Sequence, residues 1–198
     1  PGSEQELFSI DELIEAFSIE RIGKSGAKFD IQKANWFNQQ YLKNKSDEAL
    51  ASQLKVLLTE NNVVFDEPKL DRIVHAMKER VTFLSEFWTT GQYFFQKPTS
   101  YDEKVIRKKW NAEVTSVLGK YADALEKVNH LDANIAKSTL TDVLEQEGMG
   151  MGKVMQSLRV SITGEGGGPD LMDIIEILGK EEITERIRLA LTTLKDQE

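Results

Sequence analysis

The sequence of 198 residues contains no cysteine and only two histidines, His75 and His130. The absence of thiols excludes disulfide frameworks, thiolate zinc sites and cysteine nucleophiles. Neither histidine follows a glutamate by three residues, so the Glu-x-x-His pairs of a di-iron bundle are missing as well. We interpret both as structural histidines, and we expect no catalytic residue and no metal site in this chain.

Long apolar runs and a secretory leader are also lacking. No apolar stretch approaches the roughly 20 residues that a membrane helix needs. No basic, apolar and small-residue leader is found either. We therefore expect a cytoplasmic protein without a membrane partner. The first three residues, Pro1-Gly2-Ser3, have the character of a cloning remnant.

The charge balance is acidic, with 25 lysine and arginine residues against 33 aspartate and glutamate residues and a net charge of −8. This balance disfavours indiscriminate nucleic-acid binding, and we expect no DNA partner. Basic residues nevertheless form two islands, one in residues 21–45 and one in residues 104–109. Local attraction within an acidic chain suits a phosphate backbone, although charge alone favours solvated helix faces.

Apolar residues recur at three- and four-residue spacing over nearly the whole chain, and no segment shows the alternation of a strand. Ser9-Ile10-Asp11-Glu12 and Ser100-Tyr101-Asp102-Glu103 have the pattern of capping boxes that begin helices. Asp30, Ser46 and Asp66-Glu67-Pro68 indicate three further helix starts. The sequence therefore predicts an all-α fold. Later helices are expected over residues 66–84, 103–128 (weakened or ended at Gly119), 133–146, 169–178 and 183–194.

Glycine is concentrated in one part of the chain, because seven of the 13 glycines lie between residues 148 and 168. A P-loop needs a lysine and a hydroxyl residue directly after its last glycine. Here Gly168 is followed by Pro169-Asp170. We interpret residues 164–168 as a tight connection between helices.

The helical pattern breaks between Thr89 and Thr99, around the aromatic cluster Tyr93-Phe94-Phe95. We place a boundary here and divide the chain into two helical subdomains, residues 4–98 and 99–198. The three tryptophans lie on or beside apolar helix faces, which favours core packing over base stacking: Trp36, Trp88 and Trp110. These residues alone indicate a two-part helical protein with basic islands, and an all-helical protein–protein adaptor is one interpretation of it.

Three groups of residues carry more specific information. They are Ser25-Gly26-Ala27-Lys28-Phe29-Asp30 with Trp36-Phe37-Asn38-Gln39-Gln40-Tyr41-Leu42; Met77-Lys78-Glu79-Arg80-Val81 with Phe87; and Leu158-Arg159-Val160-Ser161-Ile162-Thr163-Gly164 with Gly168-Pro169-Asp170-Leu171 and Ile177-Leu178-Gly179-Lys180. In this order and at these separations they resemble the C-terminal anticodon-binding region of bacterial glutamyl-tRNA synthetase, a class I aminoacyl-tRNA synthetase.

This resemblance implies a helical bundle followed by a compact helical cage that binds tRNA(Glu) in protein biosynthesis. In the family, the parent glutamate–tRNA ligase attaches glutamate to its tRNA using ATP and Mg. Its catalytic Rossmann domain carries the HIGH and KMSKS signatures, and neither occurs here. We therefore expect a monomeric fragment that binds tRNA, holds no cofactor and is inactive on its own.

The resemblance also implies which residues contact the anticodon. Arg80 matches an arginine that reads the third anticodon base, and Arg159 matches a second contacting arginine. Gly168, Pro169 and Leu171 match residues that cradle the first base. A relative carries a hydroxyl residue where this sequence has Gly168, so a main-chain contact is implied at that position.

The role of Arg80 has a physical basis, because an arginine fork carries hydrogen-bond donors only. It suits the O2 and N3 acceptors of cytosine and opposes the N–H donors of guanine. One such pair supplies roughly 1–3 kcal/mol of discrimination. The alternative is that Arg80 only joins a surface ion pair, with Glu86 or with neighbours of Glu79. Charge alone suggests further phosphate contacts: Lys33, Lys43, Lys104, Arg107, Lys108 and Lys109.

Overall fold

The computed structural model describes residues 5–22, 26 and 28–195. Within these residues the backbone forms eleven α-helices and four short 3-10 helices, and it contains no strand. The predicted all-α class is therefore confirmed. The expected cloning remnant at residues 1–3 lies outside the described residues, as do Ser25 and Ala27 of the first family-like motif.

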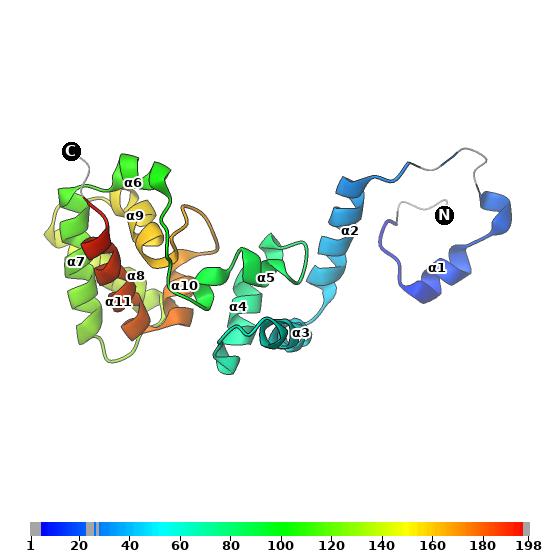
Figure 1. Ribbon diagram of the computed structural model, residues 1–198, viewed down its shortest axis with the longest axis horizontal. Coiled ribbons are helices and arrows are strands. Elements are labelled where there is room, and N and C mark those ends of the chain that lie inside the picture. Colours follow the sequence, from blue (N-terminus) through cyan, green and yellow to red (C-terminus); the bar gives the residue numbers. More distant parts are fainter. Residues whose placement is uncertain (1–4, 23–25, 27, 196–198) are drawn as a thin grey trace.

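The N-terminal part begins with α1 (Ile10–Ala16), followed by a 3-10 turn and by α2 (Ile31–Asn44). Both helices start where the sequence indicates. Ser9 forms the predicted capping box, and the Asp30 carboxylate accepts hydrogen bonds from the first turn of α2. Figure 1 shows α1 at one end of an elongated molecule, and none of its residues is buried.

A first helical group, α2 to α5, follows α1 along the molecule (Figure 1). Its core comes from the facing sides of α3 and α4, where Leu54, Leu58 and Val74 have no exposed surface. Burying each such side chain contributes roughly 1.5–3 kcal/mol. Beyond α2, the elements of this group are α3 (Asp47–Glu60), η2 (Glu67–Lys69), α4 (Leu70–Met77), η3 (Lys78–Arg80), α5 (Glu86–Thr89) and η4 (Gln92–Phe94).

The continuous helix predicted over residues 66–84 is wrong, because α4 ends at Met77 and η3 at Arg80. Val81 then takes an extended conformation and is fully buried. The backbone N–H groups of Thr82 and Phe83 donate to the Glu86 carboxylate at 2.6 and 3.3 Å instead of to helical carbonyls. These tertiary and side-chain bonds override the helical spacing, and they place Arg80 at the end of a helix.

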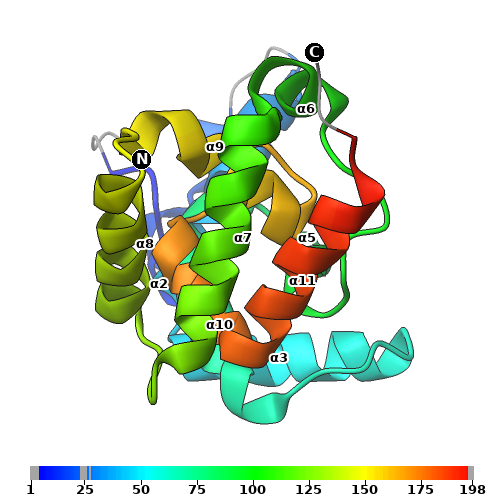
Figure 2. The same cartoon turned by 90° about the vertical axis from the view of Figure 1, so that its left-hand side faces the viewer.

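A second helical group, α6 to α11, forms the other end of the molecule. Figure 2 shows α7 in front, between α8 and α11, and α7 packs on both. Tyr121 of α7 is fully buried, and its hydroxyl donates to the Ala136 carbonyl of α8 at 3.0 Å. No helix in the described part of the chain is long and apolar enough to cross a bilayer. The elements are α6 (Glu103–Lys109), α7 (Ala112–Lys127), α8 (Ala133–Gln146), α9 (Met151–Thr163), α10 (Leu171–Leu178) and α11 (Lys180–Thr193).

The prediction of one helix over residues 103–128 needs correction in three details. The helix breaks at the buried Trp110, and Asn111 caps a new helix by accepting from the Val114 N–H. Gly119 does not end α7, which continues to Lys127. The N-cap of α6 is Asp102 instead of Ser100, because the Asp102 carboxylate accepts from the N–H groups of Lys104 and Val105 in the first turn.

The helix α9 was not expected, because three glycines before and inside it lower its intrinsic helix propensity. Its packing compensates for this loss. Val154, Leu158 and Ile162 are fully buried among neighbouring helices. The Ser157 hydroxyl also donates to the Lys109 carbonyl at the end of α6, at 3.0 Å. Tertiary burial therefore forms this helix, and it carries Arg159 to the pocket described next.

Candidate nucleic-acid interface

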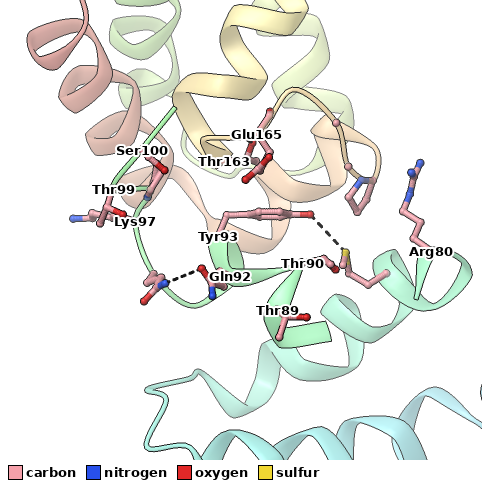
Figure 3. Close-up of a pocket in the computed structure, with 16 residues that line it drawn as sticks. Arg80, Thr89, Thr90, Gln92, Tyr93, Lys97, Thr99, Ser100, Thr163 and Glu165 are labelled. Carbon is pink, nitrogen blue, oxygen red and sulfur yellow. Dashed lines mark hydrogen bonds between the residues drawn. The ribbon is translucent and has the colours of Figure 1, made fainter. Parts of the chain in front are cut away.

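A polar pocket of about 470 Å³ opens between the two helical groups. One wall is the end of α4 and η3, a second is the connecting segment of residues 89–100, and the third is the loop of residues 163–169. Figure 3 shows Tyr93 between Arg80 on one side and Glu165 on the other. The pocket therefore combines residues that are far apart in the sequence, including three of the five predicted anticodon contacts: Arg80, Gly168 and Pro169.

Arg80 has an exposed side chain at the edge of this pocket. Among the described residues its guanidinium has no hydrogen-bond or ion-pair partner. The carboxylates that could have neutralised it are used elsewhere: Glu79 pairs with Lys43 at 2.5 Å, and Glu86 accepts two backbone N–H groups. The alternative of a surface ion pair with these acids is therefore absent from the structure, and all donors of Arg80 are available to a ligand.

Arg159 lies behind the loop and is half-buried. Its Nη2 donates to the Pro169 carbonyl at 2.8 Å. Its Nη1 is buried and has no hydrogen-bond partner within the described part of the protein. Burial lowers the pKa of this guanidinium, which nevertheless stays charged at neutral pH. Arg159 thus supports the loop main chain with one nitrogen and keeps a second donor unused.

Tyr93 lies inside the pocket, with its ring below Glu165 and its hydroxyl on the side of Arg80 (Figure 3). Its hydroxyl makes a weak bond to the Met77 sulfur at 3.6 Å. Burial raises the pKa of Tyr93 to about 12, although the charges of Arg159 and Arg80 act in the opposite direction. The hydroxyl is therefore neutral at physiological pH and remains a donor. Arg80 lines the pocket, and Nη1 of Arg159 lies behind Gly168 of the same pocket, where the Tyr93 hydroxyl is also close.

Two glycines of the loop, Gly164 and Gly168, are required by close contacts. A Cβ at Gly164 would meet the Ser100 carbonyl oxygen at 2.5 Å, and φ is +79° there. A Cβ at Gly168 would lie 3.1 Å from Nη1 of Arg159 and 3.3 Å from the Tyr93 hydroxyl, with φ at +141°. L-residues rarely adopt such angles. The loop is thus the predicted tight connection, with its backbone packed directly on the other walls.

Leu171, the fifth predicted anticodon contact, lies in a different environment. Its side chain is 1% exposed and belongs to the core of the second group. It does not line the pocket, whereas Pro169 does. Asp170 caps α10 between them, its carboxylate accepting from the Met172 N–H at 2.8 Å. Leu171 therefore anchors the end of the loop in the core.

The helix α6, which carries the second basic island, begins beside the glycine loop. The Asp102 N–H at the start of α6 donates to the Gly164 carbonyl at 2.8 Å, so this helix begins against the glycine loop. Arg107 pairs with Glu103 at 3.0 Å. The lysines of the island are exposed and make no ion pair with any described residue: Lys104, Lys108 and Lys109.

The predicted phosphate contacts on α2 have different surroundings. Lys33 pairs with Glu6 at 3.0 Å and lies 5.6 Å from the centre of the Phe37 ring. Lys43 pairs with Glu79 at 2.5 Å. Both positive charges are therefore balanced by carboxylates, and α2 lies on the far side of the first helical group from α6 (Figure 1).

The tryptophans differ in how far they are buried, and His75 has a hydrogen-bond partner. Trp110 is 1% exposed, as core packing requires, and Trp88 packs edge-on against Phe95 with 5.6 Å between ring centres. Trp36 is 38% exposed. His75 bonds Asp47 at 2.9 Å, which fits the expected structural role. The described residues contain no cluster of carboxylates and histidines that could hold a metal.

Sequence reasoning did not assign a role to several residues that line the pocket, chiefly Tyr93, Thr163 and Glu165. Tyr93 had been noted only as part of an aromatic cluster at the boundary. The signal that could have found it is this boundary itself, because pockets form preferentially where two packed units meet. Glu165 is the one acidic residue of the pocket wall, and only the fold of the loop places it there.

The all-helical fold is that of an anticodon-binding module. A family model described as "Anticodon binding domain" matches residues 36–191, and the chain belongs to this family. The resemblance to the anticodon-binding region of bacterial glutamyl-tRNA synthetase is thereby confirmed, as relatives and solved structures also show.

The chain is 48% identical over 198 residues to the glutamate–tRNA ligase of Cytophaga hutchinsonii, covering 100% of this chain and 38% of that protein. It is 43% identical over 191 residues to that of Amoebophilus asiaticus, covering 96% and 37%. A crystal structure of a glutamate tRNA ligase from Elizabethkingia meningosepticum matches with a TM-score of 0.91 at 41% identity, covering 98% of this chain and 39% of that one. The chain thus spans under two-fifths of the length of these relatives.

Proposed function

We propose that this chain is the tRNA(Glu)-binding part of a glutamate–tRNA ligase and that it reads the third anticodon base through Arg80. The observation that carries this proposal is the free guanidinium of Arg80 at the edge of the pocket, with both nearby carboxylates engaged elsewhere. A donor group that is charged, exposed and unpartnered is prepared for an acceptor on a ligand.

The chemistry of the base edge gives the specificity. Glutamate anticodons end in cytosine, whose Watson–Crick edge presents the acceptors O2 and N3. Glutamine anticodons end in guanine, whose N1–H and N2–H₂ donors would face the donors of Arg80. A well-formed arginine–base pair supplies roughly 1–3 kcal/mol of discrimination, or about 5- to 150-fold. Arg80 therefore selects the glutamate tRNA and rejects the glutamine tRNA.

The opposite wall supports a second nucleotide. Gly167 is exposed and Gly168 is partly exposed, so the loop has little side-chain bulk there, whereas Pro169 is buried and Arg159 holds its carbonyl from behind. An unpaired base can approach such a main chain closely. Leu171 contributes by anchoring the loop in the core. We assign the first anticodon base to this wall.

The phosphate backbone is attracted mainly by α6. Its lysines are exposed and lack carboxylate partners, whereas Lys33 and Lys43 on α2 are already paired. Free positive charge next to the glycine loop attracts the anticodon stem in a salt-dependent way. We therefore rank Lys104, Lys108 and Lys109 above the α2 lysines as phosphate contacts, with Arg107 between them because it pairs with Glu103.

The whole protein, by this proposal, attaches glutamate to tRNA(Glu) with ATP and Mg bound in a part of the relatives that this chain does not span. The chain alone then recognises the anticodon and has no ligase activity. Residues 4–98 and 99–198 act as its two subdomains, and the protein is a cytoplasmic monomer.

Titration with anticodon stem-loop RNAs that differ only in the third anticodon base tests this function. We expect tighter binding with cytosine than with guanine, and weaker binding of both as salt rises. Arg80→Gln removes the fixed fork, so the cytosine preference shrinks while overall affinity changes less. Arg107→Gln is the matched control, because it removes one exposed arginine of the α6 island and leaves the preference intact.

Two outcomes contradict the proposal in different ways. Equal binding of both RNAs by the unaltered protein, with no salt dependence, would indicate a protein–protein adaptor. A full cytosine preference in Arg80→Gln would keep the RNA-binding function and remove Arg80 from its specificity.

A further inference from the structure

Arg186 on α11 is an unusual side chain in this protein, because it is charged and only 2% exposed. It is the one buried charged residue of the described chain. Burial of an ion is costly unless hydrogen bonds and an opposite charge compensate for it. The partners of Arg186 therefore indicate what its burial achieves.

The guanidinium bonds three separate segments. Its Nη1 donates to the carbonyls of Tyr93 at 2.7 Å and Ile162 at 2.8 Å, and its Nη2 donates to that of Gln96 at 3.2 Å. Its Nε donates to the Glu182 carboxylate at 2.7 Å, which supplies the compensating charge. Desolvation lowers the pKa of Arg186 and Glu182 raises it, so the group remains charged at neutral pH.

Two of these carbonyls belong to one wall of the pocket, and the third lies directly before another wall. Tyr93 and Gln96 lie in the connecting segment, and both line the pocket. Ile162 is next to Thr163 and Gly164, where the loop wall begins. The Tyr93 carbonyl also fixes the backbone from which the tyrosine ring extends toward Gly168 and Arg159. One guanidinium thus holds the main chains of both walls at a fixed separation.

We propose that Arg186 is a positioning residue for anticodon recognition: it clamps the connecting segment to the glycine loop and so sets the width of the pocket. This inference rests on the proposed function for its RNA readout, and its structural part stands independently. Lysine cannot replace arginine here, because a point ammonium lacks the planar fork that reaches three carbonyls at once. Binding becomes weaker when a site must be ordered on contact with its ligand.

The distance between the walls gives the first test. The chain has no cysteine, so Gln92→Cys and Gly167→Cys introduce two unique sites for nitroxide labels. Gln92 is exposed, and a Cβ at Gly167 meets nothing within 4 Å. Electron paramagnetic resonance should give one narrow distance distribution in the otherwise unaltered protein. Arg186→Lys and Arg186→Met should broaden it while circular dichroism still shows folded helices.

A matched control lies on the same helix. Arg188 is exposed and pairs with Asp123 at 3.1 Å and Glu126 at 2.7 Å on the second group alone. Arg188→Met should therefore keep the narrow distribution and bind RNA within about twofold of the unaltered protein. Both Arg186 variants should lose about tenfold or more in affinity for the cytosine-ending stem-loop well below their melting temperatures.

The outcomes separate this inference from the proposed function. If the unaltered protein binds no RNA, the proposed function is wrong. The distances between the labels then still test whether Arg186 holds the two main chains together. If it discriminates while Arg186→Lys keeps the narrow distances and full affinity, the clamp is wrong. Unfolding of both Arg186 variants also overturns the inference, because a positioning residue leaves the helices intact.

Discussion

Arg80 and Arg159 carry the same guanidinium group, but their surroundings are opposite. Arg80 follows an interrupted helix, is exposed and has no partner among the described residues. Arg159 lies within α9, is half-buried and bonds the Pro169 carbonyl. The guanidinium of Arg80 is available to a ligand. The guanidinium of Arg159 instead holds the main chain of the glycine loop.

This difference shows that an arginine in a binding site has two separable uses. A free fork contributes specificity, because its donors are satisfied only by the correct acceptor. A hydrogen-bonded fork contributes preorganisation, because the loop it holds need not be ordered on binding. Substitutions at Arg159 should therefore lower the stability of the fold and the affinity for every RNA. Substitutions at Arg80 should instead change the preference for one RNA over another.

The largest effect is expected from Gly164→Ala in the glycine loop. The added Cβ would meet the Ser100 carbonyl at 2.5 Å, and φ is +79° at this position. Left-handed strain and overpacking together should lower the free energy of unfolding by about 3 kcal/mol, measured by urea denaturation. Gly167→Ala is the control, because its Cβ meets nothing within 4 Å. Equal stability of the two variants would show that the loop is not packed on the connecting segment.

The direct comparison of the walls comes next. Arg159→Met removes the donor to the Pro169 carbonyl and should cost about 1.5–2 kcal/mol of stability, because bonds from charged donors are strong. It should also weaken all stem-loops alike. Arg80→Met should change stability by less than about 0.5 kcal/mol. Thermal melting measures the stability of the two variants, and RNA titration measures their affinities. A larger loss of stability in Arg80→Met than in Arg159→Met would contradict the roles given to the two arginines.

A smaller effect concerns the basic islands. Replacing Lys108 and Lys109 by glutamine should weaken all stem-loops equally, and each lost phosphate contact should reduce the salt dependence of log K by about 0.7–0.9. The double replacement of Lys33 and Lys43 should change this slope less, because Glu6 and Glu79 already pair with them. Binding isotherms over a range of salt concentrations measure the slopes. A larger change from the α2 pair would reverse our ranking of the islands.

The smallest expected effect is a pH dependence of stability that arises next to Arg80. Lys78, two residues before Arg80, donates to the Asp47 carboxylate at 2.9 Å, and this bond, helped by His75, holds the pKa of Asp47 below its ordinary value. A lowered pKa stabilises the fold above the ordinary aspartate value of about 3.9, and the contribution is lost as pH falls through the lowered value.

Asp47→Asn should remove this acid-dependent contribution, seen as a shallower loss of stability in denaturation series as the pH falls below about 4. Asp71→Asn is the control, since Asp71 is exposed and has no ion pair among the described residues. If both variants lose stability at low pH as steeply as the unaltered protein, the Lys78–Asp47 bond does not stabilise the segment that carries Arg80.

Much of the fold followed from short-range patterns. Ser9, Asp30 and Ser46 cap helices at the expected positions, and residues 133–146 form a helix with the predicted bounds. Such features are predictable because a capping side chain bonds backbone groups two or three residues away. Gly179 also stops α10 as expected, with φ at +90°.

The failures have a common cause. The helical spacing continues past Met77, yet the buried Val81 and the Glu86 carboxylate interrupt it. The glycines before Lys153 conceal α9, which forms because its apolar face is buried. In both places, contacts with other helices outweigh local propensity, which amounts to under about 1 kcal/mol per residue.

The sequence by itself determined the all-α class and several helix starts, because these depend on neighbouring residues, whereas the anticodon contacts that the resemblance implies stay a prediction. Only the tertiary structure decided which arginine is free, which supports a loop and which is buried against main-chain carbonyls. The physical reason is that burial and hydrogen-bond partners come from residues far away in the sequence, as the bond from Arg186 to Tyr93, 93 positions away, shows.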